Sequence, residues 1–124
     1  MNADKQVVAP RRPDDRPRRP GHDLSVLDEL HRADAVATLR LLADETRLHL
    51  LWHLRDAERS VNDLARLVGR PSPAVSQHLA KLRMGGLVRT RRDGTQVFYR
   101  IATDHVRELV EDVVAHAQHL EEER

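Results

Sequence analysis

The chain has 124 residues, of which 33% are charged and 40% apolar, with eight histidines, no cysteine and one residue each of Trp, Tyr and Phe. The lack of cysteine excludes disulfides, thiolate catalysis and cysteine-based zinc fingers, and the scarcity of aromatic residues argues against a β-sandwich or a module that stacks bases. No apolar run approaches the ~20 residues that span a bilayer, and the N-terminus lacks the apolar core of a secretory signal, so we expect a cytoplasmic protein without membrane contact.

The net charge of +1 conceals strong charge segregation along the chain. Residues 60–100 contain eight basic and two acidic residues, whereas residues 101–124 contain two basic and seven acidic ones. A basic segment of this kind is typical of a surface that binds a polyanion. Residues 1–21 hold four prolines among charged residues and few apolar ones, which predicts a disordered basic arm ahead of one folded domain over 22–124.

Apolar residues recur at helical spacing from Leu24 to Ala43, which predicts one helix or two short ones. Acidic residues from Asp44 begin the next helix, which extends to about Asp56. Ser60 has the pattern of a capping residue for a short helix that Gly69 ends.

Ser72, as N-cap before Pro73, predicts a further helix that ends near residues 85–86. Two β-rich runs, 87–91 and 96–101, flank an Asp-Gly turn and predict a hairpin. Thr103 or Asp104 then caps a last helix. The predicted fold is therefore mainly α with one β-hairpin, an α+β winged helix-turn-helix of four helices, the hairpin and a fifth helix.

In the helix after Ser72, the apolar residues Val75, Leu79 and Leu82 share one face and should pack inward. The opposite face offers short polar and amide side chains that can reach base edges, and Gln77 suits a bidentate pair with adenine. Basic residues of this helix and of the hairpin should meet phosphates. The candidate DNA-binding residues are Ser72, Ser76, Gln77, His78, Lys81, Arg83, Arg89, Arg91, Arg92 and Thr95.

The segments LLADETRL (41–48), VNDLA (61–65), VSQHLAKL (75–82), GLV (86–88) and RDGTQVFY (92–99) resemble, in collinear order, the ArsR/SmtB family of bacterial winged-helix regulators. The resemblance spans residues 27–120, and its pattern is most similar to the nickel- and cobalt-sensing actinobacterial branch. It implies a homodimeric repressor of a palindromic operator, with the first and last helices at the dimer interface and metal binding that lowers the affinity for DNA.

The last helix carries His105, His116 and His119 as candidate metal ligands. His105 and His116 share a face but lie roughly 16 Å apart along the axis, so that one helix cannot bring all three to one ion. Two antiparallel copies of the helix can, with His105 of one and His116 and His119 of the other. An apolar seam should pair these helices, and its members are Val106, Val110, Val113, Ala117 and Leu120.

The resemblance implies four ligands, and Thr103 stands where the family pattern has Asp. The fourth ligand is left open between Asp104, water and further donors such as Gln118, Glu122 or His22. A closed tetrahedron of three imidazoles and one carboxylate suits zinc, whereas a looser site with more ligands suits nickel or cobalt, and nickel is preferred modestly over zinc. The positions of the family's cysteine site are Ser60 and Asn62, which excludes arsenite, cadmium or lead sensing there.

Three other histidines, His31, His49 and His53, fall among helical apolar residues and are expected to be structural. A second hypothesis is a DNA-binding regulator without a metal response, controlled by an accessory protein or another ligand. A zinc hydrolase is the third hypothesis, and the lack of a His-Glu-x-x-His pattern argues against it.

Overall fold

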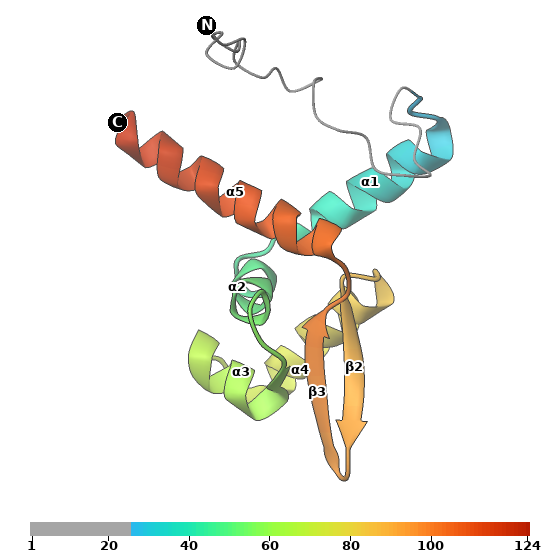
Figure 1. Ribbon diagram of the computed structural model, residues 1–124, viewed down its shortest axis with the longest axis vertical. Coiled ribbons are helices and arrows are strands. Elements are labelled where there is room, and N and C mark those ends of the chain that lie inside the picture. Colours follow the sequence, from blue (N-terminus) through green and yellow to red (C-terminus); the bar gives the residue numbers. More distant parts are fainter. Residues whose placement is uncertain (1–25) are drawn as a thin grey trace, which may run out of the picture.

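Five helices and three strands follow one another within residues 26–124, the part of the chain that the computed structural model describes (Figure 1). In chain order they are α1 (Glu29–Leu42), α2 (Glu45–Leu54), β1 (Arg59–Ser60), α3 (Val61–Val68), α4 (Ser72–Met84), β2 (Val88–Asp93), β3 (Gln96–Ile101) and α5 (Asp104–Glu122). This order confirms the predicted fold class. The predicted arm over residues 1–21, and His22, lie outside the described residues.

Side-chain caps fix where most of the helices begin. Asp28 caps α1, Asp44 caps α2, and the Ser60 hydroxyl accepts from the Asp63 backbone N–H at 3.2 Å to cap α3, as predicted. Thr103, and not Asp104, caps α5, since its hydroxyl accepts from the backbone N–H of Val106. The orphan N–H groups of these first turns are thereby satisfied locally, so that the sequence itself sets the starts.

The predicted capping role of Ser72 is wrong. Pro71 is the residue before α4, no side chain caps this helix, and Ser72 already belongs to its first turn. From that position the Ser72 hydroxyl donates instead to Asn62 Oδ1 of α3, at 3.2 Å. The hydroxyl therefore joins the two helices of the helix-turn-helix.

The predicted hairpin is confirmed, and the structure adds a third strand to it. Strands β2 and β3 are antiparallel, with Asp93 paired to Gln96 and a turn in which Gly94 has a φ of 64°. The short strand β1 pairs with β3 on its other edge, so that the sheet order is β1-β3-β2. A two-residue strand is too short to show any periodicity, which is why the sequence did not reveal it.

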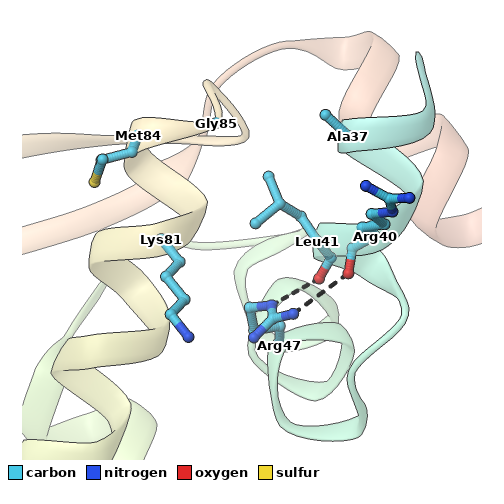
Figure 2. Close-up of a pocket in the computed structure, with 7 residues that line it drawn as sticks. All are labelled: Ala37, Arg40, Leu41, Arg47, Lys81, Met84 and Gly85. Carbon is cyan, nitrogen blue, oxygen red and sulfur yellow. Dashed lines mark hydrogen bonds between the residues drawn. The ribbon is translucent and has the colours of Figure 1, made fainter. Parts of the chain in front are cut away.

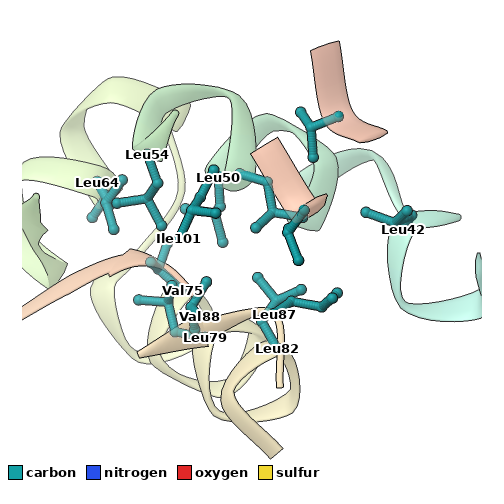
Figure 3. Close-up of a cluster of buried hydrophobic side chains, with 14 residues drawn as sticks. Leu42, Leu50, Leu54, Leu64, Val75, Leu79, Leu82, Leu87, Val88 and Ile101 are labelled. Atoms are coloured by element: carbon teal, nitrogen blue, oxygen red, sulfur yellow. The ribbon is translucent and has the colours of Figure 1, made fainter. Parts of the chain in front are cut away.

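The core surrounds the leucines of α2 (Figure 3). Leu50, Leu51 and Leu54 are at most 2% exposed, and α2 contacts α1, α3, α4, α5 and β3. Each leucine buried in this way contributes about 1.5–3 kcal/mol of hydrophobic stabilisation. Leu79 of α4 and Val110 of α5 pack in the same cluster. The ten-residue helix α2 therefore positions both α4 and α5.

Two helices extend beyond this core, α1 and the second half of α5 (Figure 1). On α1, Leu30 and Leu39 are 69% and 55% exposed. The predicted apolar seam of α5 divides: Val106 and Val110 are buried in the core of their own chain, whereas Leu120 is 42% exposed. The prediction that Val106 and Val110 pair helices across a dimer is therefore wrong, because β3 and α2 already cover that end of α5.

The three histidines that were expected to be structural lie outside the core. His31 is exposed and lies 3.0 Å from the Asp28 carboxylate, while His49 and His53 lie on the outer face of α2. Their neighbours in sequence are apolar, but the helical twist places the apolar residues on the other face. Among the described residues, no helix is long and apolar enough to cross a membrane.

Replacing Asp44 with Ala should lower the free energy of unfolding by about 1 kcal/mol, because the Arg47 backbone N–H loses its cap. That hydrogen bond lowers the pKa of Asp44, so that its stabilisation is complete above the unfolded pKa of ~3.9 and is lost as the pH falls through the folded pKa. Urea unfolding from pH 7 downward measures both effects. The exposed, mid-helix Asp34→Ala should change stability by less than about 0.5 kcal/mol, and an Asp44→Ala deficit that does not shrink in acid contradicts the assignment.

Candidate nucleic-acid interface and metal-ligand helix

Helices α3 and α4 form a helix-turn-helix with a three-residue connection. Gly69 ends α3 in the left-handed conformation, with a φ of 69°, and both its N–H and that of Arg70 donate to the Ala65 carbonyl. The inward face of α4 is the predicted one, because Val75, Leu79 and Leu82 are fully buried. This burial fixes which face of α4 remains available to a ligand.

The outer face of α4 carries Ser76, Gln77, Lys81 and Arg83, all exposed as predicted for a surface that reads DNA. Ser72 is half-buried at the start of the helix, since its hydroxyl is bonded to Asn62. Gln77 thus offers the amide best placed for a base edge, with the cations of the same helix further along it.

His78 does not share this outer environment. Its side chain is 25% exposed, Arg47 Nη1 donates to its Nδ1 at 3.3 Å, and the same nitrogen lies 3.9 Å from Asp44 Oδ1. Arginine has no acceptor, so that in this contact the guanidinium donates and the imidazole nitrogen accepts. The sequence pattern grouped His78 with Gln77, whereas the structure turns it toward the start of α2.

Arg47 of α2 contacts His78 of α4 and also the end of α1, and Figure 2 shows the contacts with α1. Its Nε donates to the Leu41 carbonyl at 2.8 Å and its Nη2 to the Arg40 carbonyl at 3.3 Å, both at the end of α1. A hollow of about 430 Å³ opens beside it between α1 and α4. The residues that line the hollow are Ala37, Arg40, Leu41, Arg47, Lys81, Met84 and Gly85. Arg47 therefore acts as a structural link between α1 and α4.

The hairpin presents Arg89, Arg91, Arg92 and Thr95 on exposed positions. Arg91 differs from the others, because its Nε and Nη2 both contact Glu58 Oε1 at 2.9 Å and its guanidinium lies 4.9 Å from the centre of the Phe98 ring. The hydrogen bond to Glu58 raises the pKa of Arg91. Within the described residues no carboxylate lies in ion-pair range of Arg89 or Arg92, so that these two hairpin arginines, unlike Arg91, keep their charge unpaired.

Sequence reasoning missed Glu58. This residue precedes β1, and the pairing of Arg59 with Tyr99 brings it beside the hairpin, where its second oxygen is 3.9 Å from Arg100 Nε. Glu58 and Arg91 are more than thirty residues apart in the sequence, so that no local sequence pattern could indicate their contact. Only the β1–β3 pairing shows that Glu58 offsets part of the positive charge of the β2–β3 hairpin, the wing of the fold.

The three candidate metal ligands His105, His116 and His119 all lie exposed on α5. His119 contacts Glu123 through Nε2 at 3.0 Å. Among the described residues of one chain, no three His, Asp or Glu side chains converge as a metal site would need.

The residues near the start of α5 are already engaged. The Thr103 hydroxyl caps the helix, and the Asp104 carboxylate binds Arg107 one turn later. Imidazole nitrogens from the histidines fit the preference of zinc, nickel and cobalt, so the donor types present suit such an ion. One oxygen of the Asp104 carboxylate is thus engaged by Arg107, which would compete with a metal ion for this group.

Two packed helices with a tight turn, followed by a basic hairpin and flanked by two extended helices, define a winged helix-turn-helix protein of the DNA-binding class. A family model described as a helix-turn-helix domain matches residues 42–91. The chain is also similar to a solved homodimeric winged helix-turn-helix domain, Mb0332 of Mycobacterium bovis, titled a possible ArsR-family regulator. That match has a TM-score of 0.69 and 33% identity over 80% of this chain and 95% of that one.

Two curated relatives come from Mycobacterium tuberculosis. The chain is 62% identical over 84 residues to the transcriptional regulator KmtR, a match that covers 68% of this chain and 65% of KmtR, and thus less than two thirds of that relative. It is 37% identical over 94 residues to the transcriptional regulator NmtR, covering 76% of this chain and 78% of NmtR. The chain belongs to the ArsR/SmtB family of winged-helix transcriptional regulators, as the sequence motifs indicated.

Replacing Arg47 with Ala should lower the free energy of unfolding by about 2 kcal/mol, since two backbone carbonyls and His78 lose a charged donor. Arg40→Ala is the matched control: its exposed guanidinium lines the same hollow, and its removal should change stability by less than about 0.5 kcal/mol. Urea denaturation at one protein concentration compares them. Equal losses in the two variants would show that Arg47 does not link α1 to α4.

Proposed function

We propose that this protein is a homodimeric transcriptional repressor that binds a palindromic operator and releases it on binding nickel, zinc or cobalt. The carrying observation is that α4 and the wing present exposed polar and basic side chains at one end of the molecule, while α5 presents three exposed histidines. The first surface suits a polyanion and the second suits a transition-metal ion.

The DNA-reading step rests on the arrangement of α4 and the hairpin. Gln77 and Ser76 would enter the major groove, because α4 is the second helix of the helix-turn-helix and these side chains are on its open face. Lys81, Arg83, Arg89 and Arg92 would contact phosphates on either side. His78 and Ser72 would support the position of α4 from within the protein, since both are bonded to other helices.

The homodimer rests on the apolar surfaces that one chain leaves exposed. Leu30 and Leu39 of α1, and Val113 and Leu120 of α5, are each between 39% and 69% exposed on helices that extend from the core. A second copy related by a two-fold axis would cover the same surfaces on both chains. It would also set two copies of α4 at the fixed separation that the half-sites of a palindrome require.

The metal response rests on α5. When two copies of α5 run antiparallel, His105 of one copy can join His116 and His119 of the other, which a single helix cannot achieve. The bound ion would bridge the two copies of α5 and so fix the angle between them. A coupling of ~1–3 kcal/mol between this angle and the spacing of the two α4 helices is enough for derepression.

A regulator of the same family without a metal response, controlled by an accessory protein or another ligand, is the second candidate. The observation in its favour is the start of α5, where Thr103 caps the helix and Asp104 binds Arg107. Thr103 has no carboxylate and one oxygen of Asp104 already binds Arg107, so that the fourth ligand would be Asp104 in competition with Arg107, water, or a further donor such as Gln118, Glu122 or His22.

Replacing Gln77 with Ala should cost ~1–3 kcal/mol at one base position and leave other positions unchanged, because only that pair is lost. Arg92→Ala should weaken binding to all sequences alike and flatten the salt dependence, whereas Arg91→Ala should do so less, since Glu58 already neutralises it. Fluorescence anisotropy with a duplex selected by the protein, and with its single-base variants, measures these effects. If Gln77→Ala behaves like Arg92→Ala, the reading face is misplaced.

Replacing both His105 and His116 with Ala should abolish operator release by nickel and zinc without changing the affinity of the metal-free protein for DNA. His31→Ala, which removes an exposed histidine from α1, is the control and should release operator as the unmodified protein does. Titration of each ion into the labelled protein–operator complex gives the readout. Unchanged release in the double variant contradicts the α5 site, and no release in the unmodified protein favours the second candidate.

A further inference from the structure

Two histidines outside α5 lie together on the outer face of α2. His49 and His53 are one helical turn apart, and their Nε2 atoms are 3.2 Å from each other. The ring centroids are 4.9 Å apart, with the planes tilted by 43°. Nothing in the DNA-binding face or in the α5 site uses this pair.

The geometry of the pair suits a shared ion. Two imidazole nitrogens that bind one ion at about 2.1 Å each stand roughly 3 Å apart. In a head-to-head arrangement the centroids would be separated by the 3.2 Å and two ring radii, which is more than the observed 4.9 Å. The rings are therefore tilted away from a head-to-head arrangement, and in a chelate this tilt would turn both nitrogens toward one ion.

The backbone under the pair is held in place by its surroundings. The other face of α2 is held by the fully buried Leu50 and Leu51, and Arg59 Nε donates to the His53 carbonyl at 2.7 Å. The backbone under the pair is thus fixed before any ion arrives.

The pair is also accessible. His49 is exposed and lines a small hollow of about 80 Å³ together with Glu45, Thr46, Val68 and Arg70, at the junction of α2 with the end of α3. Among the described residues, no third His, Asp or Glu side chain converges with the pair closely enough to complete a protein-only site. Water would therefore fill the remaining coordination positions.

We propose that His49 and His53 form a second metal-binding site, a two-imidazole chelate for a divalent transition ion, separate from the α5 histidines. Imidazole pairs bind Cu²⁺ most strongly, with Ni²⁺ and Zn²⁺ weaker. The site needs only one chain, whereas the α5 site needs two. The competing explanation of the short Nε2–Nε2 distance is an N–H···N hydrogen bond without metal affinity.

The test uses the full chain with His105, His116 and His119 replaced by Ala, so that the α5 site is absent. Titration with Cu²⁺, followed by electron paramagnetic resonance, should show an ion bound by two imidazole nitrogens. Adding His49→Ala or His53→Ala should each lower the affinity at least about tenfold, because one of the two ligands is lost. His31→Ala in the same background is the matched control and should leave the affinity unchanged.

A second measurement separates the chelate from a hydrogen bond. An ion that binds only the folded pair raises the thermal midpoint with increasing Cu²⁺ or Ni²⁺ concentration, and this rise should vanish in the His49→Ala variant. Absence of the two-nitrogen signal, or a signal that persists in both single variants, overturns the proposal. Because operator release is not the readout, failure of the α5 mechanism would leave this result unaffected.

Discussion

The structure depends on the burial of three leucines on one short helix. Leu50, Leu51 and Leu54 of α2 touch the cluster into which α4, β3 and α5 also insert apolar side chains. Because these contacts reach every other helix, they set the orientation of α4, which faces a ligand, relative to α1 and α5, which leave the core (Figures 1 and 3). Dense packing of this kind restricts how far any one of these helices can move without the others.

Polar side-chain contacts also hold the helices in their relative positions. Arg47 ties the end of α1 to His78 on α4, and Ser72 ties the start of α4 to Asn62 on α3. Both contacts are made by residues that the sequence pattern had assigned to the DNA surface or to a cap. The helix that we propose reads DNA is thus held from two sides by its own polar side chains, which leaves Gln77 and Ser76 on its open face.

Local signals predicted most of the fold. Ser60 and Thr103 cap helices, the Asp93–Gly94 turn closes the hairpin, and Val75 faces inward, because each depends on a few neighbouring residues. Two of the interactions that the sequence did not reveal have the opposite property. The partner of Arg91 is Glu58, and the partner of His78 is Arg47; both lie more than thirty residues away in the sequence. Periodicity shows which face of a helix is apolar but not which polar group from another element meets it.

By itself, the sequence determined the winged-helix class, the family, the basic segment over 60–100 and the histidines of α5, since these depend on composition, spacing and motif order. The tertiary structure decided which cations remain uncompensated, which end of α5 is buried, and how close His49 and His53 come to each other. The physical reason is that charge compensation, burial and ligand geometry each depend on the distance between two groups. Distances between such pairs exist only after the chain has packed around α2.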